Sequence, residues 1–484
     1  MLRFELTPSQ AIIIDGVKTH TMGNCWVVGG AVRDLLLKRK PKDIDFATDL
    51  EPENIKLLLK TLGFIIIPDQ TALDHGIIRT VDKHSGEIID IATLRNDDSC
   101  DGRHAKVSFT KNITEDLARR DLTINAMAAV VDKDGTIDQI IDPFGGQTDI
   151  SNKIINFVGS PDKRVKEDWL RMMRACRFCA LDQGWEKSRN TNHTLWANKE
   201  FINEVSKERV RDELLKAMSY PNPGGFIRAL DSVDMLQYVL PPVYAGIDVD
   251  QNEYHAETVY EHCLASLDAA VHLTQSPLLR LAALLHDVGK PATKSKDEAD
   301  RIHFYSHEVK GAAIVYDYMM SMRFSKKDTE YVSKLVRHHQ FRFESTSKDK
   351  TIRRWLQEVG KDVWRDLITL RCADRKGNMA KQNKPMITSH MRHLVDRATK
   401  IIEENQALFK EDLAINGNDL IRLGVKPGPI FKEIFSNILG IVVIDPDRNT
   451  REWLEAFVLK NYVNKEKNNN DQLGQDCSNN AESC

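Results

Sequence analysis

The spacing of hydrophobic and polar positions changes near residue 150 of this chain. Before that point, short apolar runs bounded by turn-forming residues predict β-strands over residues 26–28, 43–47, 76–81, 87–94 and 127–131. Beyond it, apolar residues recur mainly at helical spacing between Pro- and Gly-containing breaks, of which YPNPGG at 220–225 is the strongest. The pattern predicts an α+β region followed by mostly α-helical regions.

The length of 484 residues is enough for about three domains that each bury a core. Breaks and shifts in composition place the expected segments at residues 1–149, 150–222, 223–254, 255–400, 401–464 and 465–484. The last segment is polar and rich in Asn, so it cannot bury enough apolar surface to become ordered.

Composition narrows the class of protein. Hydrophobic residues make up 41% and charged residues 29%, as in soluble proteins, and the formal net charge of −3 excludes a uniformly basic nucleic-acid coat. Any RNA contact must therefore come from local groups of Lys and Arg. The N-terminus lacks a signal-peptide pattern, no apolar run is long enough to span a membrane, and eight scattered cysteines indicate a reducing compartment. We expect a cytoplasmic protein. The one CxxC, Cys176 to Cys179, has no second pair for zinc and predicts two buried helix residues.

The most informative segment is VVGGAVRDLLLKRKPKDIDFAT at residues 27–48. An apolar run leads into Gly29 and Gly30, and a second predicted strand carries Asp43 and Asp45. Side chains two apart on a strand share a face, and paired carboxylates repel unless a cation such as Mg²⁺ lies between them. The glycines let backbone N–H groups approach a phosphate. This combination predicts nucleotidyl transfer, and the alternative is a polar edge strand after an ordinary turn.

Further segments follow in an order that resembles the tRNA nucleotidyltransferase and poly(A) polymerase family. They are LARRDLTINAMA (117–128), DPFGG (142–146), KEDWLRMMRACRF (166–178) and ERVRDELLKAM (208–218). The resemblance covers most of the first 220 residues. It implies a polymerase-β-like nucleotidyltransferase head over 1–149, a helical neck that selects the nucleotide over 150–222, a body over 223–254 and a tRNA-contacting tail over 401–464.

The resemblance also assigns roles to single residues. Asp43 and Asp45 would hold the catalytic Mg²⁺, and Asp90 is a third carboxylate that could equally face solvent. The nucleotide would contact Gly29, Gly30, Arg33, Arg120, Asp121, Asn125, Asp168, Arg171 and Arg174. Two of these have ordinary structural alternatives, because Arg33 could form a surface pair and Asp121 could cap a helix.

Asp168 and Arg171 carry the prediction for base choice. On a helix, positions three apart share a face, so the two side chains can address one planar base. Cytosine and adenine both place an exocyclic amine beside a ring acceptor, which a carboxylate and a guanidinium would recognise together. A helical salt bridge between the two residues is the alternative. The family uses this pair as a protein template.

Two segments of the head resemble moving parts. We expect LRNDDSCDGRHAKVSFT, at 94–110, to form a mobile loop. In the family this loop, including Asp101 to Arg103, is needed to switch from CTP to ATP, which argues against an enzyme that adds only CC. DPFGG resembles a hinge between head and neck, although a simple turn is nearly as good an interpretation.

A second set of potential metal-binding residues lies in the mostly helical part of the sequence. His262, then the pair His286 and Asp287 after an apolar helix, then Asp374, follow the order of the HD phosphohydrolase superfamily, which they resemble. Imidazole with carboxylate suits Mn²⁺ or Ni²⁺, with Mg²⁺ also possible, and His307 and His338 could extend the site. The alternative is a structural relic with satisfied core histidines.

Together the motifs resemble a CCA-adding enzyme that carries an HD domain over 255–400. The resemblance implies tRNA as the partner, CTP and ATP as substrates, and phosphatase and 2′,3′-cyclic phosphodiesterase activity in the HD domain. Lys426 in GVKPGP could approach an RNA phosphate or simply precede a capped helix. The alternatives are a poly(A) polymerase, an enzyme adding only CC or only A, an HD phosphohydrolase with an RNA-binding head, and a non-catalytic RNA scaffold. Monomer and homodimer both remain open.

Overall fold

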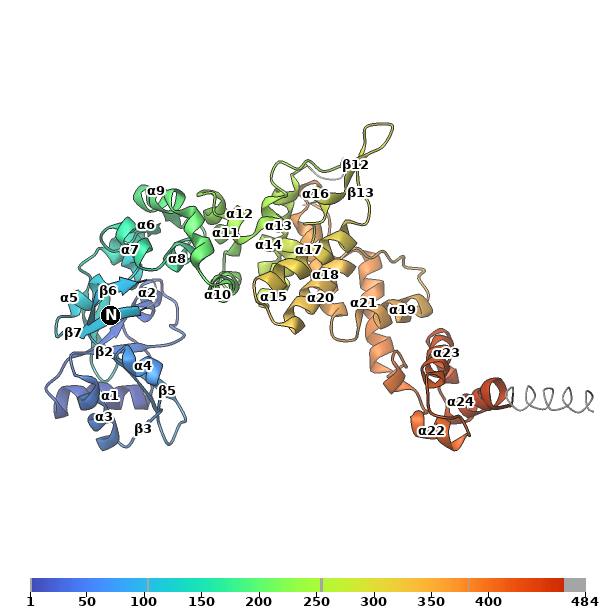
Figure 1. Ribbon diagram of the computed structural model, residues 1–484, viewed down its shortest axis with the longest axis horizontal. Helices are drawn as coiled ribbons and strands as arrows, with labels where there is room; N and C mark the ends of the chain where they lie inside the picture. Colours follow the sequence, from blue (N-terminus) through green and yellow to red (C-terminus); the bar gives the residue numbers. More distant parts are fainter. Residues whose placement is uncertain (1, 102–103, 253–255, 382, 465–484) are drawn as a thin grey trace, which may run out of the picture.

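The computed structural model describes residues 2–101, 104–252, 256–381 and 383–464. The chain forms an elongated molecule whose parts follow one another in sequence order (Figure 1). The strand-rich N-terminal region lies at one end, two helical regions occupy the middle, and the C-terminal helices lie at the other end. The α+β fold predicted from the apolar pattern is confirmed. No helix in the described ranges has the length and apolar character needed to cross a bilayer.

The N-terminal region is built on a seven-stranded sheet with the strand order β3-β4-β5-β2-β1-β8-β9. Its strands are β1 (Cys25–Val28), β2 (Asp45–Thr48), β3 (Ile65–Ile66), β4 (Ile77–Val81), β5 (Ile88–Thr93), β8 (Ala128–Val131) and β9 (Ile137–Ile141). Only β2 and β5 pair in parallel. The predicted strands are present, but β2 begins at Asp45, so Asp43 precedes the strand instead of lying on it.

Alternation along the strands sends the two faces of this sheet to different partners. Val27 and Phe46 belong to the main core together with residues of helices α1 (Pro8–His20) and α3 (Pro52–Thr61). Trp26 and Val28 point to the opposite face and pack in a smaller cluster. Asp45 pairs with Val28 across the strands, so its carboxylate also lies on the face away from α1 and α3.

The segment expected to be a mobile loop is regular. Residues 95–101 and 104–109 form two antiparallel strands, β6 (Arg95–Asp101) and β7 (His104–Phe109). Asp and Ser residues in this segment misled the prediction, because ladder pairing overrides their local preference for turns. Gly102 and Arg103 lie outside the described residues.

The first half of the chain contains further helices, some within the head and others between the head and the second half. Those of the first half are α2 (Gly30–Leu36), α4 (Gln70–Asp74), α5 (Ile113–Ala118), α6 (Gly146–Asn152), α7 (Pro161–Glu167), α8 (Leu170–Phe178), α9 (Arg189–Ala197), α10 (Lys207–Met218), α11 (Pro223–Asp231), α12 (Leu236–Val239) and α13 (Pro241–Tyr244). A short parallel pair consists of β10 (Ile154–Ile155) and β11 (Glu186–Lys187), and β11 lies between α8 and α9 in sequence. Cys176 and Cys179 are buried, as expected.

The second half is almost entirely helical. Its elements are α14 (Val259–Val271), α15 (Pro277–Leu285), α16 (Lys290–Thr293), the hairpin β12 (Lys294–Lys296) and β13 (Ile302–Phe304), α17 (His307–Ser321), α18 (Lys326–His338), α19 (Asp349–Val359), α20 (Trp364–Gly377), α21 (Ser389–Glu403), α22 (Gly417–Arg422), α23 (Ile430–Ile444) and α24 (Arg451–Val458). One continuous apolar core runs from the head to Leu408, and the last three helices enclose a separate core. The segment 465–484 lies outside the described residues.

Candidate active sites

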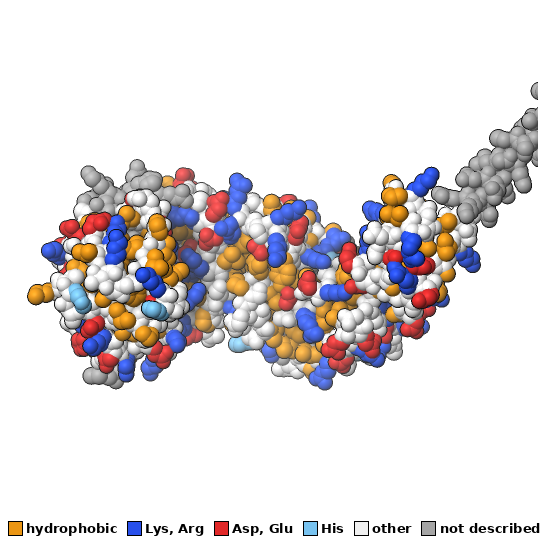
Figure 2. All heavy atoms as spheres, turned by 90° about the horizontal axis from the view of Figure 1, so that it is seen from below, with side chains coloured by type: hydrophobic (Ala, Val, Ile, Leu, Met, Phe, Trp, Pro, Cys, Tyr) orange, Lys and Arg blue, Asp and Glu red, His pale blue; other side chains and the backbone are white. Residues whose placement is uncertain are grey.

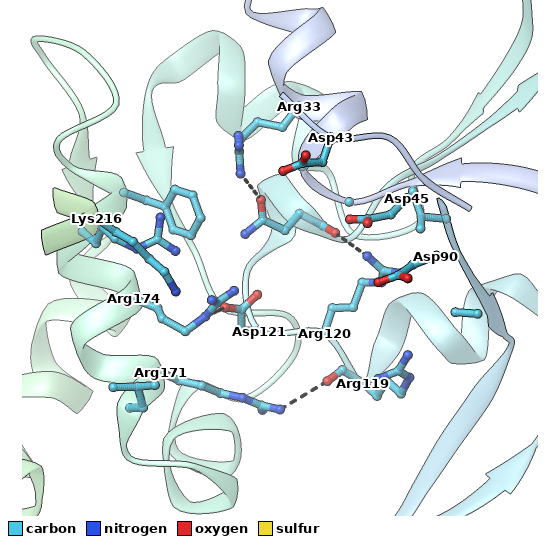
Figure 3. A pocket seen from close by; sticks show the side chains of 18 of the residues that line it. Arg33, Asp43, Asp45, Asp90, Arg119, Arg120, Asp121, Arg171, Arg174 and Lys216 are labelled. Carbon is cyan, nitrogen blue, oxygen red and sulfur yellow. Dashed lines mark hydrogen bonds and ion pairs between the residues drawn. The ribbon is translucent and has the colours of Figure 1, made fainter. Parts of the chain in front are cut away.

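A cavity of 1160 Å³ lies where the head meets helices α8 and α10. Every residue predicted from sequence for nucleotidyl transfer lines it: Gly29, Gly30, Arg33, Asp43, Asp45, Arg120, Asp121, Asn125, Asp168, Arg171 and Arg174. Figure 3 shows the carboxylates of Asp43, Asp45 and Asp90 on the head side, across from cationic side chains of the helical side. Residues up to 145 positions apart in sequence, Gly29 and Arg174, therefore meet in one place.

The cavity is positively charged although the chain is not. Ten Lys and Arg side chains and five Asp side chains line it, whereas the whole chain has a net charge of −3. On the face of the molecule in Figure 2, basic and acidic side chains are interspersed instead. An excess of cations in a recess attracts a polyanion such as a triphosphate. Sequence reasoning missed several of these cations, namely Lys42, Arg95, Arg119, Arg177, Arg209 and Lys216.

The environment of Asp45 disfavours its charged form. Its side chain keeps contact with solvent, yet the surrounding cavity wall partly desolvates it and raises its pKa. The carboxylates of Asp43 and Asp90 raise this pKa further, and Arg120 opposes them. Such mutual repulsion is what a bound cation would relieve. Asp90 is less available, because Arg79 donates two hydrogen bonds to it, at 2.9 and 2.8 Å.

The glycine pair and Arg33 form the floor beside these acids. Gly29 has a φ of +71°, and a Cβ there would lie 2.7 Å from the guanidinium of Arg120. Arg33 is buried and donates a hydrogen bond to the side-chain oxygen of Asn125 at 2.6 Å, while also pairing with Asp34. Arg33 therefore does not form the surface pair that was the alternative.

Asp121 lies at the centre of the cavity wall. Its carboxylate accepts a 2.5 Å hydrogen bond from Arg174 Nε and a 2.9 Å bond from the backbone of Leu122. Burial alone would raise its pKa, but the ion pair with Arg174 lowers it to about 2. Asp121 does not cap a helix, since the following 3₁₀ turn has Leu122 as its N-cap. The helix-cap alternative is thus excluded.

The expected single helix through Asp168 and Arg171 is interrupted. Helix α7 ends at Glu167, α8 begins at Leu170, and Asp168 between them has an extended backbone. Asp168 accepts hydrogen bonds from both terminal nitrogens of Arg209, at 3.1 and 2.7 Å, and Arg171 pairs with Glu167 at 2.5 Å. The i,i+3 salt bridge is absent from these pairings. Both side chains nevertheless line the cavity, because the break turns the chain toward it.

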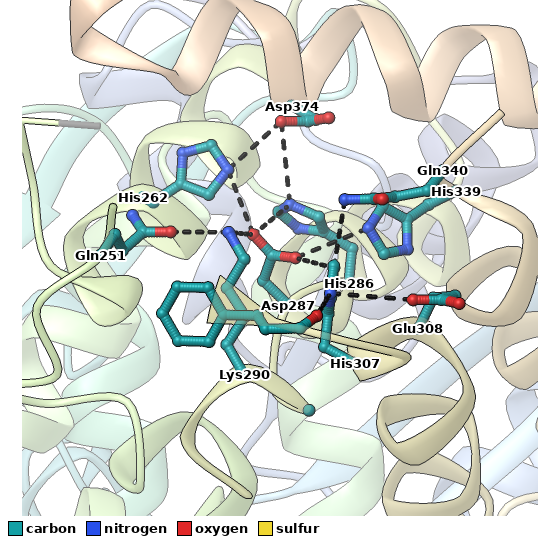
Figure 4. A network of polar contacts seen from close by, with 12 residues as sticks. Gln251, His262, His286, Asp287, Lys290, His307, Glu308, His339, Gln340 and Asp374 are labelled. Atoms are coloured by element: carbon teal, nitrogen blue, oxygen red, sulfur yellow. Dashed lines mark hydrogen bonds and ion pairs between the residues drawn. The ribbon is translucent and has the colours of Figure 1, made fainter. Parts of the chain in front are cut away.

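A second polar site is buried in the helical half (Figure 4). His262 comes from α14, His286 and Asp287 follow α15, and Asp374 comes from α20. His262 Nε2 lies 3.3 Å from Asp374 and 3.5 Å from Asp287, and His286 Nε2 lies 3.2 Å from Asp287. The four residues predicted from sequence therefore converge.

Two further histidines complete this site. The Nε2 atoms of His307 and His339 lie 3.2 and 3.5 Å from Asp287 Oδ1. The prediction of His338 was wrong: α18 ends at His338, whose ring instead lies 3.6 Å from Glu358. One residue of helical rotation separates the two rings, and sequence spacing alone could not choose between them. We call His262, His286, Asp287, His307, His339 and Asp374 the HD cluster.

The donor set of the HD cluster fits metal ions. Two groups of three have ligand atoms within 4.8 Å of one another: His262 with His286 and Asp374, and Asp287 with His307 and His339. His286, His307 and His339 each place Nδ1 against a backbone carbonyl, at 2.9, 2.8 and 2.7 Å. This contact fixes the proton on Nδ1 and turns the Nε2 lone pair inward, as at metal sites.

The buried carboxylates of the HD cluster also favour a positively charged partner. Burial would lower the pKa of His262, but the carboxylates of Asp374, Glu257 and Asp287 raise it to about 9. The ammonium of Lys290 lies 2.6 Å from Asp287 and donates to Gln251. Asp287 Oδ1 has no hydrogen-bond partner of good geometry among the described residues. A cation would satisfy these buried oxygens.

Comparison with known proteins follows the same division of the chain. Residues 25–156 match the family model described as "Poly A polymerase head domain", 188–245 match "Probable RNA and SrmB- binding site of polymerase A", and 259–379 match "HD domain". The CC-adding tRNA nucleotidyltransferase of Thermus thermophilus is 31% identical over 457 residues, which cover 91% of this chain and 94% of that protein. The chain belongs to the class II CCA-adding and poly(A) polymerase family of nucleotidyltransferases, with an HD domain.

The names of other relatives state different nucleotide-adding activities. The A-adding tRNA nucleotidyltransferase of Deinococcus radiodurans is 28% identical over 84% of this chain and 89% of that protein. The mitochondrial CCA tRNA nucleotidyltransferase 1 of Homo sapiens is 37% identical, but the match covers only 46% of the chain and 50% of that protein. A crystal structure of the Bacillus stearothermophilus CCA-adding enzyme with CTP is similar over 96% of this chain and 100% of that one, with a TM-score of 0.63 and 25% identity.

Proposed function

We propose that this protein is a tRNA nucleotidyltransferase that adds C, C and A to tRNA 3′ ends from CTP and ATP. The observation that carries the proposal is the cavity in which Asp43 and Asp45 lie across from a cationic wall. Mg²⁺ held by these two carboxylates would lower the pKa of the RNA 3′-hydroxyl and neutralise charge on the triphosphate. Arg33, Arg120 and the backbone N–H of Gly30 would orient the phosphates for in-line attack on the α-phosphorus, with loss of pyrophosphate.

Base choice follows from the ion pairs that Asp168 and Arg171 form in the cavity. Asp168 is held by Arg209 and Arg171 by Glu167, so both charges are compensated before a nucleotide binds. A cytosine or adenine would take over these contacts by donating its amine to Asp168 and accepting from Arg171. Uracil and guanine would instead place a carbonyl oxygen against Asp168 and a ring N–H against Arg171, so neither residue could exchange its present partner for a favourable contact.

We further propose that the enzyme adds all three nucleotides, C, C and A, and not only CC or only A. It rests on the segment 94–110, which resembles the segment that the family uses to pass from CTP to ATP. Three tRNA transcripts, ending before C, before CA and before A, separate the possibilities. We expect all three to end in CCA and then stop. Long A tails would instead indicate a poly(A) polymerase, and extension of only one or two transcripts a partial enzyme.

The tail is the proposed second contact with tRNA. Lys426 borders a 620 Å³ pocket beside α23, whose first turn has no side-chain cap. The positive end of a helix dipole and a nearby ammonium suit an RNA phosphate. Lys426→Gln should weaken tRNA binding while leaving the affinity for CTP unchanged.

We also propose that the HD cluster is a metal-dependent phosphohydrolase centre for phosphomonoesters and 2′,3′-cyclic phosphates. Mn²⁺, Ni²⁺ or Mg²⁺ held by the cluster would supply an activated water and neutralise the phosphate. The water oxygen would add to phosphorus, the P–O ester bond would break, and the leaving alkoxide would take a proton. Lys290 is within reach of the cluster to stabilise the developing charge. Loss of metal-stimulated phosphatase in Asp287→Asn, with CCA addition intact, tests this assignment.

A further inference from the structure

Trp169 lies in sequence between the two residues proposed to choose the base, yet it is not among the residues that line the transferase cavity. Its neighbours do line that cavity, namely Asp168, Leu170 and Arg171. The indole of Trp169 instead stacks on the ring of Phe201, with centroids 4.4 Å apart and planes 9° from parallel. The template segment, which we define as residues 168–171, is therefore held from outside the cavity as well as from within.

The backbone of the template segment links the position of Trp169 to both template residues. Asp168 has an extended backbone, with φ of −160° and ψ of 109°, and α8 begins two residues later, so Trp169 occupies the turn between them. The carbonyl of Trp169 accepts a hydrogen bond from the N–H of Met172 at 3.1 Å, and the carbonyl of Asp168 accepts one from the N–H of Arg171 at 3.0 Å. A shift of the indole would therefore move the Asp168 carboxylate and the first turn of α8 together.

The ring stack is a contact that base binding leaves in place. Arg209 holds the carboxylate of Asp168 in the structure, but the amine of a bound base would replace it. Arg171 would likewise exchange its present carboxylate partner for the ring nitrogen of the base. The contact between Trp169 and Phe201 includes no atom that the nucleotide takes over. It can therefore hold the template segment while the ion pairs are exchanged.

Phe201 lies at the surface, which separates an effect on the template segment from an effect on folding. It belongs to the 3₁₀ segment Lys199–Glu204 and is 46% exposed. Its neighbour Ile202 is buried in the main core instead. Because removal of a half-exposed ring leaves no cavity in the core, a substitution at Phe201 should loosen the template segment without unfolding the protein.

We propose that Phe201 is a positioning residue that sharpens base choice, because its ring holds Trp169 in place. Trp169 in turn holds Asp168 and Arg171 at the separation that fits cytosine or adenine. Uracil, which places a carbonyl oxygen against the carboxylate, fits only if these side chains move, and the stack resists that movement. The inference rests on the base choice proposed above, and it adds a residue that acts without touching the nucleotide.

The test measures kcat/KM of the full chain with Mg²⁺ for CTP and for UTP, on a tRNA transcript that ends before CCA. We expect Phe201→Ala to lower the ratio of CTP to UTP about fivefold. A purely structural defect would lower the active fraction equally for both nucleotides and leave this ratio unchanged. Phe201→Tyr keeps a ring and should keep the wild-type ratio. Trp196→Ala removes a 52% exposed ring from neighbouring α9 and is the matched control, which should also keep it.

Failure of the positioning role and failure of the template give different results. An unchanged ratio in Phe201→Ala, with a lowered ratio in Arg171→Ala, overturns the role of Phe201 while the template stands. An equal fall of the ratio in Phe201→Tyr or Trp196→Ala also overturns it. If Arg171→Ala keeps the wild-type ratio, the template fails, and the action of Phe201 through it fails too.

A wild type that incorporates no nucleotide would contradict the proposed transferase, and calorimetric binding of CTP and UTP then decides the role of Phe201. That role stands only if Phe201→Ala weakens the binding of CTP about fivefold relative to that of UTP and Trp196→Ala does not.

Discussion

Replacing Arg174 with Met should destabilise the protein in a way that depends on pH, because it leaves the buried carboxylate of Asp121 without its ion-pair partner. The carboxylate of Asp121 is 9% exposed and accepts a 2.5 Å hydrogen bond from Arg174. A pKa of about 2 in place of 3.8 corresponds to about 2 kcal/mol of stability. Removing one partner of a buried pair typically costs about 3–5 kcal/mol. Since Arg174 is 32% exposed, we expect about 3 kcal/mol at pH 7.

The sign of the pH dependence distinguishes this mechanism from lost packing. In the wild type, the lowered pKa contributes stability that is present above about pH 4 and is lost as the pH falls toward 2. In Arg174→Met, burial is the dominant remaining effect and raises the pKa of Asp121. The variant should therefore gain stability as the pH falls from 7 to 5, while the wild type does not.

Urea denaturation of both proteins at pH 7 and pH 5 measures the difference in the free energy of unfolding. The double variant Asp121→Asn/Arg174→Met is the control, and it should recover most of the loss at pH 7 because no buried charge remains. A deficit that is the same at both pH values, or that the second substitution leaves in place, would refute the reasoning.

Three other outcomes can be checked on the transferase cavity. Asp43→Asn should lower nucleotide incorporation at least about a hundredfold while tRNA affinity in a filter-binding assay stays unchanged, and substantial residual incorporation would contradict a metal role. Arg171→Ala should raise UTP incorporation relative to CTP in single-turnover assays; an unaltered rejection of UTP would count against the template role. Gly29→Ala should reduce incorporation about tenfold or more, because φ is +71° and the methyl group would displace Arg120, whereas Gly63→Ala, also at positive φ but distant from any neighbour, should leave it intact.

Sequence reasoning predicted residues that the structure brings to one cavity, because these residues come in short motifs with fixed local geometry. Gly29 and Gly30 must follow a buried strand to bring backbone to a phosphate, and the alternation around β2 sends Asp45 away from the apolar core. In the HD cluster, the pair His286 and Asp287 could likewise be recognised from sequence, because it follows an apolar helix. The paired strands β6 and β7 were missed, because their polar residues favour turns unless a partner strand is available.

The tertiary structure alone decided which charges pair and which histidines meet. Arg209 and Lys216 reach the cavity only because α10 packs against α8, and the break at Asp168 redirects a motif that local periodicity described as one helix. His339 instead of His338 joins the cluster because α18 and α17 pack with one particular rotation. Local sequence fixes which residues are close along the chain and how a strand or turn orients them. Contacts between distant segments depend on how whole helices dock, and no short stretch of sequence encodes that.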